Sequence, residues 1–221
     1  MIKPNRILKA AADVFFPQHL KCHCCNREAV VNEQGICSEC EGKLLYVPIL
    51  PQLYGVDGFS AGLMYNEPVR NALVSFKFNG AVYKKEFFAH YMQVPPEWTA
   101  DCIVPVPLCA SRMKERGYNQ SALLAREVSK RCGLPLREEL LKRVRETEKQ
   151  SLMTHDQRLK NLKGAFRASE DCRGLSIILI DDIKTTGATL CECSKELKKR
   201  GAARVYALCA CCAMEKGSGN E

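Results

Sequence analysis

The sequence predicts an α/β protein: a mostly parallel sheet flanked by helices, preceded by a small cysteine-rich module. Apolar runs that are typical of buried strands alternate with helical segments, which is the order of parallel βα units. Two of the strands, 101–107 and 177–180, are each followed by a polar loop and then a helix, so both loops belong at the carboxyl ends of the sheet and face one crevice. Two C-x-x-C pairs near the beginning of the chain mark the separate module.

Length and composition favour a soluble, cytoplasmic protein with no membrane partner. The 221 residues can bury one core and a small appendage, and no apolar run approaches the ~18 residues of a membrane span. Asp13 and Pro17 interrupt the N-terminal stretch, and no signal-peptide cleavage site follows. The fourteen cysteines belong to a chain that is large enough to fold without disulfide bonds, so we expect reduced thiols.

The positive charge is concentrated in one part of the chain. Residues 112–167 hold fifteen Lys or Arg against seven Asp or Glu, an excess that equals the net charge of +8 of the whole sequence. This excess predicts an electropositive rim around an anionic substrate or a track for nucleic acid. A solvated helix face is the alternative for many of these residues.

The two cysteine pairs predict a structural zinc site. They are separated by eleven residues and consist of Cys22, Cys25, Cys37 and Cys40. Each C-x-x-C turn lets two thiolates meet one Zn²⁺, and four thiolates complete its tetrahedron without leaving a position open for catalysis. His23 and Cys24 lie inside the first pair and are alternative ligands, and a cluster of free thiols is the other interpretation. We expect this module in residues 1–50 and the main domain in 51–221, because prolines interrupt the stretch between them.

The main domain begins with a strand and two helices. Pro68 suits the start of the first helix, and Asn79 with Gly80 suits its end. Lys77, in the last turn, has two interpretations: it reaches a phosphate, or it compensates the helix dipole. The predicted elements, in chain order, are strand 59–65, helices 68–78 and 81–91, strand 101–107, helix 121–131, strand 140–144, helix 157–162, strand 177–180, helix 188–200 and strand 203–210.

Strand 177–180 leads directly into candidate binding residues. Two acids, Asp181 and Asp182, stand where the strand surfaces, and a hydroxyl-rich bend follows, made of Thr185, Thr186, Gly187, Ala188 and Thr189. Backbone N–H groups of such a bend can surround an anion at the start of a helix. The carboxylates, about one sugar ring away, can accept hydrogen bonds from ribose hydroxyls. These residues predict a site for a phosphorylated ribose; the alternative is an ordinary turn in which a threonine caps the helix.

The segment after strand 101–107 is a basic, glycine-containing loop. Its cations and its glycine can hold a pyrophosphate, because guanidinium and ammonium groups and free backbone amides suit several negative charges. The candidate residues are Arg112, Arg116, Gly117, Tyr118 and Asn119, followed by Lys114 and Gln120. A basic loop that only aids solubility is the alternative.

A further stretch, 145–154, has no sustained pattern and is predicted to be a mobile lid. In sugar-phosphate transfer a closing loop excludes water, which is the competing nucleophile at the anomeric carbon. The candidate contacts of this lid are Arg143, Gln150, Arg158 and Asn161. Each of them taken alone also fits an ordinary surface position.

The run 177–190, IILIDDIKTTGATL, resembles the 13-residue signature with which type I phosphoribosyltransferases bind phosphoribosyl pyrophosphate (PRPP), apart from Lys184 at a usually aliphatic position. Together with IVPVPL, RGYNQ, GAF and the two C-x-x-C pairs, nearly the whole chain resembles the ComF family. That resemblance implies a type I phosphoribosyltransferase fold with an N-terminal zinc knuckle. It also implies a role in DNA uptake and processing during natural transformation.

The resemblance further implies how PRPP is held. Asp181 and Asp182 would take the ribose hydroxyls, 185–189 the 5′-phosphate, and the Arg116 loop with Mg²⁺ the pyrophosphate. The implied function is a PRPP-binding phosphoribosyltransferase-like protein. The alternative is a non-catalytic PRPP sensor, or an adaptor that binds single-stranded DNA, a competence helicase or another DNA-processing protein. Turnover is left open, but glutamine amidotransferase activity is not expected, because the chain starts at Met1 and runs into a metal knuckle instead of opening with a cysteine nucleophile.

Overall fold

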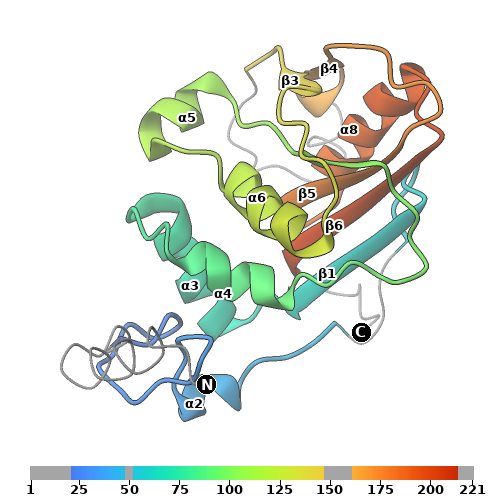
Figure 1. Ribbon diagram of the computed structural model, residues 1–221. Coiled ribbons are helices and arrows are strands. Elements are labelled where there is room, and N and C mark those ends of the chain that lie inside the picture. Colours follow the sequence, from blue (N-terminus) through green and yellow to red (C-terminus); the bar gives the residue numbers. More distant parts are fainter. Residues whose placement is uncertain (1–20, 48–51, 147–160, 214–221) are drawn as a thin grey trace, which may run out of the picture.

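The computed structural model describes residues 21–47, 52–146 and 161–213 (Figure 1). Its centre is a four-stranded sheet in the order β1-β6-β5-β2. The strands are β1 (Gly58–Met64), β2 (Cys102–Pro105), β5 (Ser176–Lys184) and β6 (Arg204–Cys212). All three neighbouring pairs run parallel. The predicted parallel sheet is confirmed.

Helices cover both faces of this sheet because its central strands are apolar on both sides. One face carries α3 (Glu67–Phe78), α4 (Lys84–Tyr91) and α6 (Gln120–Cys132), and the other carries α8 (Ala188–Lys199) (Figure 1). Along β5, Ile178 and Ile180 pack with the first group, whereas Ile177 and Leu179 pack with α8. Among the residues that the structure describes, no helix has the length and apolarity needed to cross a bilayer.

The sheet opens at the carboxyl end of β2. Pairing between β2 and β5 stops at Pro105 with Ile180, whereas β5 stays paired with β6 as far as Lys184. Asp181 and Asp182 therefore lie inside β5, and not after the strand as the sequence predicted. Because β2 ends first, residues 181–184 form an edge of the sheet, and that edge faces the chain that leaves β2.

Two elements differ from the prediction. The basic segment after β2 forms a short helix, α5 (Ala110–Arg116), instead of a loop, and Gly117 ends that helix with a φ of 79°. None of its residues is buried, so it has no apolar stripe that the sequence could reveal. β3 (Leu141–Arg143) lies within the predicted strand 140–144 and pairs antiparallel with β4 (Phe166–Ala168), which the sequence did not predict. Most of the predicted helix 157–162 lies outside the described residues.

The cysteine module packs against the layer of α3 and α4 and shares one apolar cluster with it (Figure 1). A short helix in this module, α2 (Ser38–Glu41), carries Cys40. The fully buried Lys84 joins the two parts: its Nζ donates to His23 O (2.7 Å), Asn26 Oδ1 (3.1 Å) and Ser75 Oγ (2.6 Å). Three oxygen partners make this buried ammonium tolerable, since an unpaired one would cost several kcal/mol.

Candidate functional site

A cavity of about 290 Å³ opens at the carboxyl ends of β2 and β5. Segments that are far apart in the sequence line it, from α3, α5, α6, β3, β5 and the bend after β5. Its polar lining consists of Lys77, Arg112, Arg116, Gln120, Ser121, Arg143, Asp181, Asp182, Thr185 and Thr189. The structure therefore brings residues of both predicted loops to one cavity.

Asp181 is held by donors from two elements. Its Oδ1 accepts from Ser121 Oγ and from the backbone N of Asp182, each at 2.9 Å. Burial, and next the negative charge of Asp182, raise the pKa of Asp181 to about 7. The sequence did not indicate Ser121, because its role depends on how α6 packs on β5.

Asp182 forms an ion pair inside the cavity. Its Oδ1 lies 2.7 Å from Lys77 Nζ, and the two side chains are only 10 % and 16 % exposed. Neither interpretation of Lys77 in the sequence foresaw this partner. The pair does not turn Asp182 away from the site, because both residues line the same cavity as Asp181 and the bend.

The bend after β5 begins α8 without a side-chain hydrogen bond from the N-cap residue. Gly187 stands at the N-cap with a φ of 80°, a conformation that favours glycine, and a Cβ there would lie 2.6 Å from Leu53. Thr185 and Thr189 line the cavity, whereas Thr186 Oγ1 faces Ala188 N at 3.4 Å. Ala188 N, in the first turn of α8, thus donates to Thr186 Oγ1, as in the predicted capped turn. The N-cap itself is a glycine without a side chain, which leaves room for an anion at the start of the helix.

Three arginines form the basic wall of the cavity: Arg112, Arg116 and Arg143. Arg116 Nη1 donates to Gln120 Oε1 at 2.9 Å, and burial lowers the pKa of Arg116. Among the described residues, the buried atoms Arg116 Nε and Gln120 Nε2 have no hydrogen-bond acceptor. Burial raises the pKa of the nearby Tyr118 hydroxyl, and Gln120 acts in the opposite direction. Buried donors of this kind need an acceptor, which an anionic oxygen of a ligand would supply.

The other predicted pyrophosphate residues are absent from the lining of this cavity. Gly117, Tyr118 and Asn119 line a neighbouring cavity of about 530 Å³. Tyr118 Oη donates to Phe76 O at 2.5 Å, and Asn119 caps α6 by accepting from Ser121 N at 3.0 Å. In this structure they hold α5 and α6 in place, and their contact with a ligand stays a prediction.

The predicted lid residues are only partly described. Arg143 lines the cavity, its guanidinium lies 5.4 Å from the centre of the Phe166 ring, and burial lowers its pKa. Asn161 O accepts from Arg145 Nη2 at 2.7 Å. Gln150 and Arg158 lie outside the described residues.

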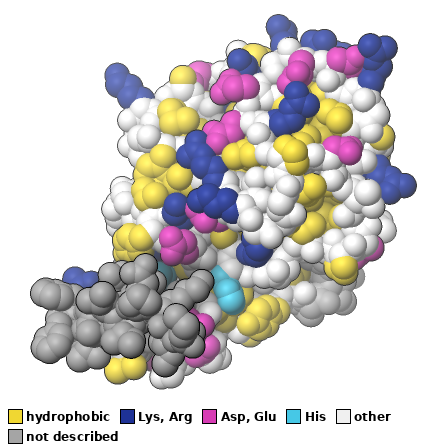
Figure 2. Space-filling view, viewed as in Figure 1, with side chains coloured by type: hydrophobic (Ala, Val, Ile, Leu, Met, Phe, Trp, Pro, Cys, Tyr) yellow, Lys and Arg dark blue, Asp and Glu magenta, His cyan; other side chains and the backbone are white. Residues whose placement is uncertain are grey.

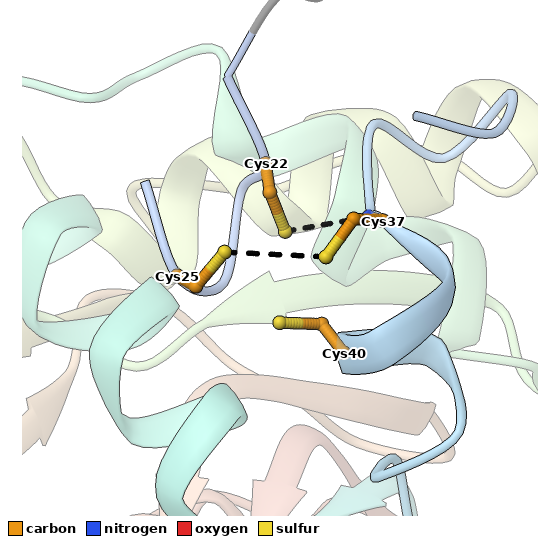
Figure 3. Close-up of side chains that lie close together, drawn as sticks. All are labelled: Cys22, Cys25, Cys37 and Cys40. Carbon is orange, nitrogen blue, oxygen red and sulfur yellow. Dashed lines mark hydrogen bonds between the residues drawn. The ribbon is translucent and has the colours of Figure 1, made fainter. Parts of the chain in front are cut away.

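The four predicted metal ligands converge within the cysteine module (Figure 3). The Sγ atoms of Cys22, Cys25, Cys37 and Cys40 all lie within 4.8 Å of one another. Such a set of four sulfurs fits one tetrahedral ion, whereas His23 and Cys24 are not part of the group. Although burial acts in the opposite direction, hydrogen bonds from Arg27 lower the pKa of Cys25 to about 6, which favours the thiolate that a metal requires.

Comparison with known sequences identifies a phosphoribosyl transferase domain over residues 119–221. The chain is 39% identical over 111 residues to the DNA utilization protein YhgH of Salmonella typhi, covering 50% of this chain and 49% of that one. It is 32% identical over 153 residues to competence protein F of Haemophilus influenzae (62% and 65% covered), and 34% identical over 145 residues to competence protein ComFC of Bacillus subtilis (63% and 57%). The chain thus spans about half the length of the first of these relatives, and the predicted resemblance to the ComF family is confirmed.

Similar solved structures include the glutamine PRPP amidotransferase of B. subtilis, with 17% identity, 64% of this chain and 27% of that chain covered, and a TM-score of 0.36. Another is the purine phosphoribosyltransferase of Pyrococcus horikoshii, with 14% identity, 64% and 82% covered, and a TM-score of 0.30.

Proposed function

Because this chain is a relative of the ComF-family competence proteins and carries a phosphoribosyl transferase domain, we propose that it binds PRPP and acts in DNA uptake or processing during natural transformation. One observation supports this most: two adjacent carboxylates, a helix start with glycine at its N-cap and a basic wall lie at one cavity. Asp181 and Asp182 would accept from the ribose hydroxyls, and the bend 185–189 would take the 5′-phosphate. Arg112 and Arg116 would face the pyrophosphate.

This arrangement suits transfer chemistry without a protein nucleophile. When an acceptor attacks the anomeric carbon, the bond from that carbon to the pyrophosphate oxygen breaks and pyrophosphate leaves. The guanidinium groups of Arg112, Arg116 and Arg143 would neutralise the leaving group, while the acids fix the sugar. Mg²⁺ would be bound with PRPP, mainly by oxygens of the ligand itself.

We propose that the cysteine module holds one structural Zn²⁺ through Cys22, Cys25, Cys37 and Cys40. Its role would be to fix the fold of a segment that has little core of its own. None of the fourteen cysteines, all of which lie in the described part of the chain, forms a disulfide bond. That is consistent with a cytoplasmic location.

Binding of single-stranded DNA or of a helicase partner is the second proposal, and it starts from the positive charge of residues 112–167. On the face shown in Figure 2, Lys and Arg side chains are interspersed with Asp and Glu. Several cations of residues 112–167 form ion pairs, including Arg126 with Glu138 and Arg137 with Glu170. The described part of this face therefore supports a local contact with nucleic acid more than a long track. Binding that is absent, or that does not weaken with salt, would exclude this partner.

The test of PRPP binding is a calorimetric titration with and without Mg²⁺, together with an assay of pyrophosphate release in the presence of bases or DNA. We expect Asp181→Ala/Asp182→Ala to weaken binding by about 100-fold or more, since two charged acceptors are lost. Asp171→Ala is the matched control, because Asp171 is exposed and pairs with Arg173 just before the opposite end of β5. Binding without release would favour a sensor or adaptor over an enzyme. Equal binding by the wild type and the double variant would refute the proposed site.

A further inference from the structure

Lys77 occupies a position that its sequence context does not explain. A lysine in the last turn of a helix usually extends into solvent, but this side chain is 16 % exposed and reaches a carboxylate of another element. By contrast, the surface pair Arg27–Glu39 is 62 % and 52 % exposed. A pair as buried as Lys77–Asp182 is costly to desolvate. Because both residues line the cavity, we looked for a role of the pair in ligand binding.

The fold holds Lys77 in place through its neighbours. The last turn of α3 is fixed on three sides: Ser75 Oγ contacts Lys84 of α4, Phe76 O accepts from Tyr118, and the Phe78 ring lies 4.8 Å from the Arg116 guanidinium. The turn that carries Lys77 is therefore held by contacts with both α4 and the α5–α6 segment. A flexible surface lysine would have no such support.

The two adjacent acids of the cavity differ in the charge of the groups that contact them. Two adjacent carboxylates repel each other in a site of low dielectric, and a cation in contact with one of them reduces that repulsion. Lys77 is in direct contact with Asp182, whereas Asp181 relies on neutral donors from Ser121 and the backbone. One acid thus has a fixed counter-ion and the other has none in direct contact among the described residues.

We propose that Lys77 is a positioning residue for the sugar end of the pocket, which holds the Asp182 carboxylate in the orientation in which it can accept from a ribose hydroxyl. This inference rests on the proposed PRPP site and names the part of the ligand that depends on Lys77. In this arrangement the three arginines contact the anionic groups of the ligand, whereas Lys77 contacts Asp182, and Asp182 contacts the sugar. Loss of Lys77 therefore acts on ligands that contain ribose.

Calorimetry with three probes tests this: PRPP, ribose 5-phosphate and inorganic pyrophosphate, at one fixed Mg²⁺ concentration. For Lys77→Met we expect PRPP and ribose 5-phosphate to bind about tenfold more weakly, and pyrophosphate to change by less than about threefold. Lys77→Arg, which keeps the charge, should recover most of the sugar affinity. Lys85→Met is the matched control, since Lys85 forms its ion pair with Glu127 away from the cavity.

A double-variant cycle makes the test specific. If Lys77 acts through Asp182, Lys77→Met should have little further effect in an Asp182→Asn background. Thermal unfolding of each variant identifies any that fail to fold, and in that case the comparison of Lys77→Arg with the wild type decides. Additive effects, or equal loss for all three probes, would overturn the inference and leave PRPP binding intact. A wild type that binds neither PRPP nor ribose 5-phosphate would overturn both proposals.

Discussion

The cysteine module and the cavity at the carboxyl ends of β2 and β5 are built in opposite ways. The four converging sulfurs of the module all come from residues 22–40, and two tight turns bring them together. The cavity draws its lining from α3, α5, α6, β3 and β5, and it exists only because β2 ends before β5. A site made within one short segment depends on local spacing, whereas a site made by a sheet depends on the register of the whole domain.

The last turn of α3 connects these two regions. Ser75 contacts Lys84, which also binds the module through His23 O, and Lys77 contacts Asp182 in the cavity. A substitution in one region can therefore alter the metal content or the PRPP affinity of the other, and the variants below test this.

The largest effect is expected on the metal site. Cys37→Ser removes one of four ligands, and we expect the bound metal to fall from about one per chain to none, with unfolding of the module, because such sites supply their own folding free energy. Elemental analysis of protein purified without chelator, followed by thermal unfolding, measures this. Cys132→Ser, at an exposed cysteine, is the control. Metal-free wild-type protein would rule out the zinc site, and loss of metal in Cys24→Ser would show that the ligand set is wrong.

A change in the wall of the cavity should leave the metal untouched. For Arg116→Met we expect PRPP to bind at least about tenfold more weakly, because the variant removes a half-buried guanidinium whose buried Nε has no acceptor in the described structure. Metal content should stay the same. PRPP affinity equal to that of the wild type would mean that the pyrophosphate does not lie at this wall.

Lys84→Met tests the connection between the regions. Three oxygens lose their donor, so we expect the free energy of unfolding to fall by about 2 kcal/mol and the thermal midpoint by roughly 4–8 °C. PRPP should bind about two- to fivefold more weakly while metal content is unchanged, because α3 is less firmly held. With Lys85→Met as the reference, unchanged PRPP affinity would show that the module and the cavity are independent.

The smallest effect concerns the pH dependence of stability. The pKa of Asp181 is raised from 3.8 to about 7 in the folded protein, so between these pH values the folded chain keeps a proton that the unfolded chain has lost. The stabilising contribution of this group is complete below about pH 4 and is lost as the pH rises to about 7. Asp181→Asn should therefore raise the thermal midpoint at pH 8 by about 2–4 °C relative to the wild type, and by much less at pH 4. An equal shift at both pH values would contradict the raised pKa.

The sequence predicts the parts of the molecule that depend on local spacing better than the parts that depend on the packing of distant segments. The metal ligands, β5, β6 and the start of α8 are marked by spacing, long apolar runs and a glycine, all of which act locally. The short strand β4 has three residues, too few to show a period, and α5 has no buried face. Neither could be detected from pattern alone.

Within the cavity, residues that are adjacent in the sequence could be predicted, but their partners from distant helices could not. Asp181, Asp182 and the bend were evident because they follow one another in the chain. Ser121 and the partner of Lys77 were not, since each depends on a helix that packs against β5 from a distant part of the sequence. Sequence pattern thus located the strand whose acids line the cavity, and only the packing of α3 and α6 revealed how these acids are held.

We propose that this cavity contacts both the sugar and the phosphate groups of one PRPP molecule. A crystal structure with PRPP and Mg²⁺ bound tests this most directly. We expect ribose hydroxyls within hydrogen-bond distance of Asp181 and Asp182, the 5′-phosphate in the bend 185–189, and the pyrophosphate against Arg116. A ligand bound elsewhere, or a 5′-phosphate remote from the bend while the acids contact no hydroxyl, would contradict it.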